Sequence, residues 1–263
     1  MKSFHRARAS SLLLVLSALS PLFAGLPPAI ASDKADSSEW RFAVTPYVWA
    51  CGVVGTVGVM GRKAHVDLSF SDVLGHADKT GLLAFQGFRG KQYFFFDGMY
   101  LDAADTEPYT LHEEQGALFA DVDITMKRMQ AAWGTRVFES DSAAAYIFVG
   151  VRYWGLTNRL TFRTASVTLK SYKDDESWID PIVGVRFEKR LSPTLSFIGM
   201  LDAGGFGVGS DFTWEAMADF SWRISKRFSI ELGYRYLYLD YEKNGFVMDT
   251  YNDGIFIGLN WSL

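Results

Sequence analysis

Residues 212–224 read FTWEAMADFSWRI, and apolar and polar side chains alternate along the whole stretch. Trp214 and Phe220 fall on one face of an extended chain, whereas Glu215 and Asp219 fall on the other. A period of two residues is typical of a β-strand with one apolar face, because the apolar positions of an amphipathic helix recur every 3.6 residues. This stretch therefore decides the fold in favour of β-structure.

The same alternation recurs along the chain and predicts ten strands. They span residues 40–52, 80–90, 92–102, 122–138, 143–157, 177–190, 194–207, 211–225, 228–241 and 250–263. Short turns and longer links alternate between the strands, which is the arrangement of outer-membrane barrels with their turns in the periplasm. We predict an all-β fold, a closed antiparallel transmembrane β-barrel of about ten strands, with twelve or eight strands as alternatives.

Two of the longer links contain further alternating segments. Residues 54–60 with 65–70 predict one extra hairpin, and residues 159–163 with 167–171 predict another. Each hairpin either adds two membrane strands or extends its neighbours above the membrane. In the first of these links, Ser71 is a candidate cap for a short helix that runs towards Ala77.

The first 31 residues have the features of an export signal. Three basic residues precede an apolar segment at 11–26, and Ala29-Ile30-Ala31 matches the small-x-small site of signal peptidase. We predict a cleaved signal peptide at residues 1–31 and one outer-membrane β-barrel domain at residues 32–263. The predicted location is the outer membrane of a Gram-negative bacterium.

Charge and cysteine content exclude two classes of protein. The chain has 26 basic and 30 acidic residues, and cleavage removes three basic ones, which leaves a net charge of about −7. This charge argues against a nucleic-acid partner. A single cysteine, Cys51, excludes an internal disulfide framework. Because the metal-binding motifs CxxC, HExxH and the EF-hand loop are absent, we expect no metal and no cofactor.

Alternation alone does not show which face points outward, because a soluble barrel would bury its apolar face. The polar face carries charges of both signs, and strand parity assigns eleven of them to the lumen. These are Asp97, Arg128, Arg136, Arg152, Arg186, Glu188, Glu215, Asp219, Arg223, Glu231 and Arg235, with Arg41 as a twelfth on the first strand. Arginine without lysine favours planar, hydrogen-bonded pairing in an enclosed space. We therefore predict a charged network that fills the lumen.

Aromatic residues near the strand ends predict two girdles at the membrane interfaces. They are Trp40, Phe138, Phe187 and Phe228 on the turn side, and Trp49, Tyr100, Trp154, Trp178, Trp214 and Tyr238 on the loop side. The last strand has apolar residues at every second position and Trp261 near its end. It resembles the C-terminal signature of outer-membrane proteins, with Leu263 in place of the usual phenylalanine.

Several segments resemble a family of uncharacterised, porin-like bacterial outer-membrane β-barrel proteins. They are Thr45-Pro46-Tyr47-Val48-Trp49 with Gly52 and Gly55, Val66-Asp67-Leu68-Ser69-Phe70, Trp178-Ile179-Asp180-Pro181-Ile182-Val183-Gly184, Asp202-Ala203-Gly204-Gly205-Phe206-Gly207 and Gly233-Tyr234-Arg235-Tyr236-Leu237. The resemblance spans nearly the whole mature chain. It implies the barrel fold and the outer-membrane location, and it brings no activity.

Catalytic patterns are weak. His65, Asp67 and Ser69 put three triad residue types on one face of a short segment, but such a parity match arises often by chance. The glycines of residues 205–209 do not have dinucleotide-binding spacing and fit a tight turn. Asp174-Asp175-Glu176 reads as a solvated acidic loop. We therefore predict that the protein is not an enzyme.

Barrel size bears on the function. Eight strands enclose only enough room for side chains, whereas 16 to 18 leave an aqueous channel, so ten strands lie near the filled end. We predict a structural or surface-interaction barrel with a largely filled polar lumen. A narrow channel for small solutes, with a polar path past Arg128, Arg152 and Glu231, is the alternative. An enzyme with a site in the outer loops is third. The expected partners are outer-membrane lipid, the barrel-assembly machinery and, for the channel, a small solute.

Overall fold

A computed structural model describes residues 38–70, 80–109, 118–164 and 167–263. Twelve β-strands make up most of this part of the chain. They are β1 (Arg41–Cys51), β2 (Val53–Val59), β3 (Arg62–Leu68), β4 (Thr80–Arg89), β5 (Gln92–Tyr109), β6 (Leu118–Glu139), β7 (Ala143–Arg163), β8 (Thr168–Arg190), β9 (Leu195–Gly204), β10 (Phe212–Arg223), β11 (Phe228–Lys243) and β12 (Phe246–Ser262). Within these ranges, no helix is long and apolar enough to span a membrane.

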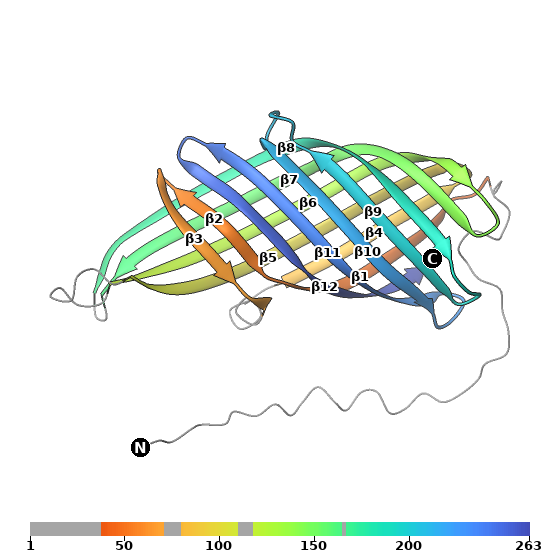
Figure 1. The fold of residues 1–263 in the computed structure, drawn as a ribbon, viewed down its shortest axis with the longest axis horizontal. Helices are drawn as coiled ribbons and strands as arrows, with labels where there is room; N and C mark the ends of the chain where they lie inside the picture. The colour runs from red at the N-terminus through yellow and green to blue at the C-terminus, as the bar shows by residue number, and fades with distance from the viewer. Residues whose placement is uncertain (1–37, 71–79, 110–117, 165–166) are drawn as a thin grey trace, which may run out of the picture.

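Ten of the strands form a closed barrel (Figure 1). β1 pairs with β4 on one side and with β12 on the other, and β4 to β12 follow one another in chain order. All pairs are antiparallel. Closure removes the sheet edges, so the backbone groups of these strands bond to neighbouring strands. The predicted ten-stranded barrel is confirmed.

The extra hairpins differ in their placement. β2 and β3 form the first one, and residues 54–58 of β2 continue the pairing along β12 beyond the part that faces β1. The second is not separate, because β7 and β8 run unbroken through residues 159–163 and 168–171. The predicted helix between Ser71 and Ala77 lies outside the described residues.

The barrel has a turn end and a loop end. The turn end holds the short connections at 90–91, 140–142, 191–194 and 224–227. At the loop end, β5 to β8 run farther than the other strands (left in Figure 1). β8 has 23 residues, whereas about 9–11 residues of a tilted strand cross a bilayer. More than half of β8 therefore extends past the lipid band.

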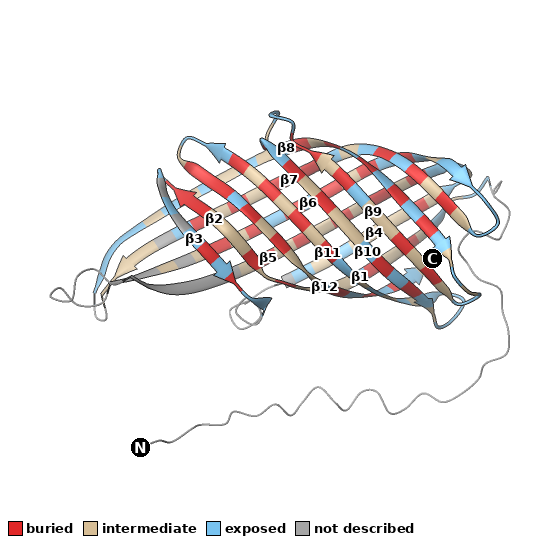
Figure 2. Cartoon of the chain, viewed as in Figure 1, coloured by how far each residue is buried: buried red, intermediate tan, exposed pale blue. Residues whose placement is uncertain are grey.

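Side chains alternate between the two faces of the wall, which gives the banded pattern of Figure 2. Arg128 and Arg152 point inward and are fully buried. Val149 and Leu232 point outward and are 64% and 52% exposed. An apolar outer face of this kind is stable against lipid rather than against water. The apolar face points outward, as the sequence predicted.

Three tryptophans of the predicted outer girdle lie elsewhere. Trp49, Trp154 and Trp178 point into the barrel, and Trp154 has no exposed surface. Their positions follow the parity of the charged lumen residues, because Trp154 lies two residues after the inward Arg152 on β7. The girdle prediction was wrong for these three residues, because their parity on the strand directs them inward although they lie near strand ends.

An apolar core fills the lumen at the loop end. It includes Trp49, Val57, Val66, Leu68, Met126, Trp154, Leu156, Leu237, Leu239 and Phe246. The hairpin of β2 and β3 contributes side chains to this core, and β2 contacts β7 and β8 on the opposite wall. The lumen is therefore polar only in part, and its loop end is packed like the interior of a soluble protein.

Candidate functional site

A layer of six charged side chains crosses the lumen just below the apolar core. Three arginines come from β6, β7 and β11, and three carboxylates come from β5, β9 and β10. They are Arg128, Arg152 and Arg235 with Asp97, Asp202 and Glu215. All six are buried, and inward parity on long strands brings them to one level. We call this set the charged layer.

Glu215 lies at the centre of the charged layer. Its carboxylate forms an ion pair with Arg128, lies 3.2 Å from Nη2 of Arg152, and lies 2.8 Å from Nε of Arg235. One carboxylate thus links β10 to its neighbour β11 and, across the lumen, to β6 and β7. Contacts of this kind fix the distance between opposite walls of the barrel.

The remaining contacts link the two other carboxylates to the same arginines. Asp97 lies 2.5 Å from Arg128 and 3.0 Å from Arg235, and Asp202 lies 2.6 Å from Arg152. Three positive and three negative charges therefore compensate one another. Ion pairs this deeply buried are stable only when the charges are matched and hydrogen-bonded.

Neutral side chains complete the layer. Nε of Arg152 donates to Gln130 at 2.7 Å, and Gln130 donates to Asp202 at 3.2 Å. The Tyr47 hydroxyl donates to Asp97 at 2.7 Å and accepts from Arg235 at 2.6 Å. With these bonds the layer joins side chains of β1, β5, β6, β7, β9, β10 and β11 across the lumen.

A second charged group lies nearer the turn end. Arg186 and Glu188 form an ion pair at 2.7 Å, and Arg136 pairs with Glu139 at 3.1 Å. Asp219, Arg223 and Glu231 also lie on lumen-facing positions of β10 and β11. The structure thus places all eleven sequence-derived residues on the lumen side, in two groups rather than in one network. Arg41, the twelfth, is exposed at the start of β1.

The predicted lumen network omitted one member of the charged layer, Asp202, and the two neutral residues that complete it, Gln130 and Tyr47. Asp202 has the same parity as Ile198 and Met200 on β9, so counting along the strand would have found it. Gln130 and Tyr47 carry no charge, so a search for charged lumen residues does not find them. Glu231 lies below the layer beside Asn260, whereas Glu215 links the arginines of the layer.

A buried carboxylate anchors the loop between β9 and β10 at the loop end. Asp180 accepts from the backbone amide of Ser210 at 2.7 Å, from the Ser210 hydroxyl at 2.6 Å and from Nε1 of Trp154 at 2.9 Å. Gly209 lies so close that an added Cβ would meet the Asp180 carboxylate at 2.6 Å. The glycines of this segment therefore serve a tight turn, and Asp180 holds the turn over the lumen.

Replacing Asp180 by alanine is expected to release this loop. The change leaves the Ser210 and Trp154 donors buried without an acceptor, and each such group costs about 1–3 kcal/mol. Limited proteolysis of the folded barrel should then cut within residues 205–211, whereas the native protein resists cleavage there. The matched control is Asp211→Ala, which removes an exposed carboxylate from the same loop and should leave the resistance unchanged.

The weaker catalytic patterns gain no support from the geometry. His65, Asp67 and Ser69 are all exposed around β3, a strand that pairs only with β2 in the described residues. Asp175 on the β8 extension accepts from Thr157 at 2.5 Å and pairs with Lys173 at 2.8 Å. It belongs to a strand and not to a loop, which corrects that prediction. The two other histidines of the mature chain, His76 and His112, lie outside the described residues.

Comparison with known proteins places the fold. No protein-family model matches the chain, and no curated protein matches its sequence. The outer membrane protease OmpT from Escherichia coli is similar in structure with a TM-score of 0.56 and 8% identity, over 89% of this chain and 100% of OmpT. The chain has the fold of a bacterial outer-membrane β-barrel. The translocator domain of the autotransporter NalP from Neisseria meningitidis also matches, with a TM-score of 0.46 and 11% identity over 84% of this chain and 88% of that domain. At such identities the likeness extends to the fold alone.

Proposed function

We propose that this protein is an outer-membrane barrel with a closed lumen, which acts through its surface beyond the membrane and not as an open pore. The charged layer around Glu215 carries the proposal. Its arginines and carboxylates bond to one another across the lumen, and the apolar core covers the layer at the loop end. A solute that crossed the barrel would have to separate the ion pairs of the charged layer and displace the side chains of the apolar core. Separating a buried ion pair is costly.

The extended wall of β5 to β8 is the surface we propose for interaction. It carries charges of both signs that pair along its faces, such as Arg163 with Asp121 at 2.6 Å and Lys173 with Asp175 at 2.8 Å. A paired sheet that continues past the lipid band presents these polar groups beyond the membrane surface. This surface suits a polar partner outside the cell, and we propose no catalytic role for it.

The same proposal includes export to the outer membrane. It is supported by the signal-like residues 1–31 and by the apolar outer face of the barrel. Membrane fractionation with N-terminal sequencing should find a mature chain that begins at Ser32 in the outer-membrane fraction. Recovery of the folded chain from the soluble periplasmic fraction without detergent would contradict the proposal.

A narrow channel is the second candidate, favoured by a cavity in the lumen between the charged layer and the turn end. Liposomes that contain the purified barrel separate the two functions. With a closed lumen they should not swell faster than empty liposomes in isotonic arabinose, glycine or urea. Rapid swelling with any of these solutes would replace the closed barrel by a channel.

A further inference from the structure

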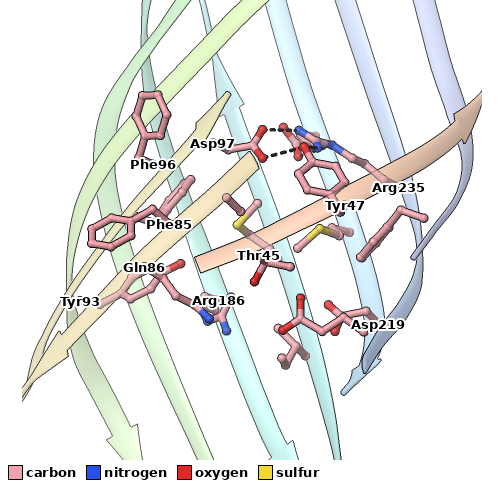
Figure 3. A pocket seen from close by; sticks show the side chains of 18 residues that line it. Thr45, Tyr47, Phe85, Gln86, Tyr93, Phe96, Asp97, Arg186, Asp219 and Arg235 are labelled. Atoms are coloured by element: carbon pink, nitrogen blue, oxygen red, sulfur yellow. Dashed lines mark hydrogen bonds and ion pairs between the residues drawn. The ribbon is translucent and has the colours of Figure 1, made fainter. Parts of the chain in front are cut away.

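The cavity between the charged layer and the turn end has the features of a binding site. It is a hollow inside the lumen that is open on one side. β1, β4 and β5 contribute to its lining, and so do β8 with Arg186 and β9 to β12 (Figure 3). Phe95, Ile198, Met217 and Phe256 form apolar walls. Concave sites with apolar walls and a few polar groups are typical of small-molecule binding.

The ceiling of this cavity has no free charge. Asp97 contacts both Tyr47 and Arg235, and dashed lines mark these contacts in Figure 3. Arg235 is also paired with Glu215 in the charged layer. The charges on this side of the cavity therefore compensate one another. A charged ligand would need a partner of opposite charge at the other end of the cavity.

The opposite end of the cavity has more carboxylates than basic side chains. Asp219 is 3% exposed, and its Oδ1 atom has no hydrogen-bond partner in the described part of the chain. Glu231 lies on the neighbouring strand, diagonal to Asp219 in the register of β10 and β11, and on the same face. Arg186 of β8 also lines the cavity and attracts both carboxylates, but its ion pair is with Glu188. One arginine therefore serves three carboxylates at this end of the cavity.

We infer that this cavity binds a small organic cation. Its ammonium group would lie between Asp219 and Glu231, and its apolar part would pack against Phe95, Met217 and Phe256. An unpaired carboxylate is costly when buried, and a bound ammonium ion compensates it through short, charge-assisted hydrogen bonds.

The lining favours an organic cation over a metal ion. The described residues contain no group of three or more His, Cys, Asp or Glu side chains placed to hold a metal. Two carboxylates with apolar neighbours suit an amine with an aromatic or aliphatic body. Glu231 is partly exposed, so the ligand would enter from the turn end, below the charged layer.

The test is isothermal titration calorimetry on the folded barrel in detergent with 2-phenylethylamine as the probe. We expect saturable binding, and we expect 2-phenylethanol, which has the same ring and no charge, to bind at least tenfold more weakly. The Asp219→Asn variant and the Asp219→Asn/Glu231→Gln variant should lose affinity for the amine by at least tenfold. Asp211→Asn, which changes an exposed carboxylate outside the cavity, should keep it.

Three outcomes would overturn the inference. They are absence of saturable binding to the wild type, equal binding of the alcohol and the amine, and unchanged affinity in both cavity variants. The comparison of amine with alcohol uses the wild type, so it decides the question even if a variant fails to fold. It is also independent of whether the barrel conducts solutes or presents a surface for interaction.

Discussion

Replacing Glu215 by alanine should destabilise the barrel by about 3–5 kcal/mol, the usual cost of removing one partner from a buried ion pair. The expected value is at the high end because Glu215 is paired with three arginines and is only 1% exposed. Arg128, Arg152 and Arg235 would keep Asp97 and Asp202 as partners, which leaves three positive charges against two negative ones in a closed space. Urea unfolding in detergent, followed by tryptophan fluorescence, measures the change.

The matched control is Glu242→Ala. Glu242 forms an ion pair with Lys63 at 2.9 Å, but both side chains are about half exposed. Exposed pairs of this kind contribute about 0.2–1 kcal/mol. If Glu215→Ala and Glu242→Ala change the free energy of unfolding by the same small amount, the charged layer does not hold the barrel together.

Replacing Leu232 by arginine should cost about 2–4 kcal/mol of folding free energy in a bilayer, the cost of a lipid-facing arginine near the midplane. Leu232 is 52% exposed on the outer face and pairs with Phe220 and Ile257, which are also exposed. Folding into phospholipid vesicles as a function of urea gives the difference from the wild type.

The control is an arginine substitution at an inward position where the lumen has room for the longer side chain. Gly233, the inward neighbour, is unsuitable because an added Cβ would meet the Cβ of Asp219 at 2.4 Å. Gln86 is suitable, since it lines the cavity that also holds Asp219 and Glu231. If Gln86→Arg costs as much as Leu232→Arg, the assignment of inner and outer faces would be contradicted.

The fold could be predicted from the sequence because the alternation of apolar and polar residues is visible within each strand. Alternation in residues 212–224 and 228–238 separates an outer apolar row from an inner polar row, and parity alone then places Glu215 and Arg235 inside. Such local patterns predict the orientation of each side chain, because every strand of a closed barrel faces lipid on one side and the lumen on the other.

The sequence was insufficient for the site because pairing across the lumen depends on strands that are far apart in the chain. Arg128 and Glu215 are 87 residues apart, and no local pattern relates them. The apolar core at the loop end was missed for a similar reason. Leu237 and Leu239 continue the inward row of Arg235. The local sequence does not show that these two side chains pack against the hairpin of β2 and β3.

Single-channel recording in planar lipid bilayers tests the closed lumen most directly. The purified, refolded wild-type barrel should give no steady conductance above that of the bare bilayer, in conditions under which a general porin gives clear steps. The charged layer and the apolar core predict this result, because together they block the lumen between the cavity and the loop end with paired charges and packed side chains. A stable conductance that every inserted wild-type barrel shows would contradict it, and would mean that water passes beside Glu215.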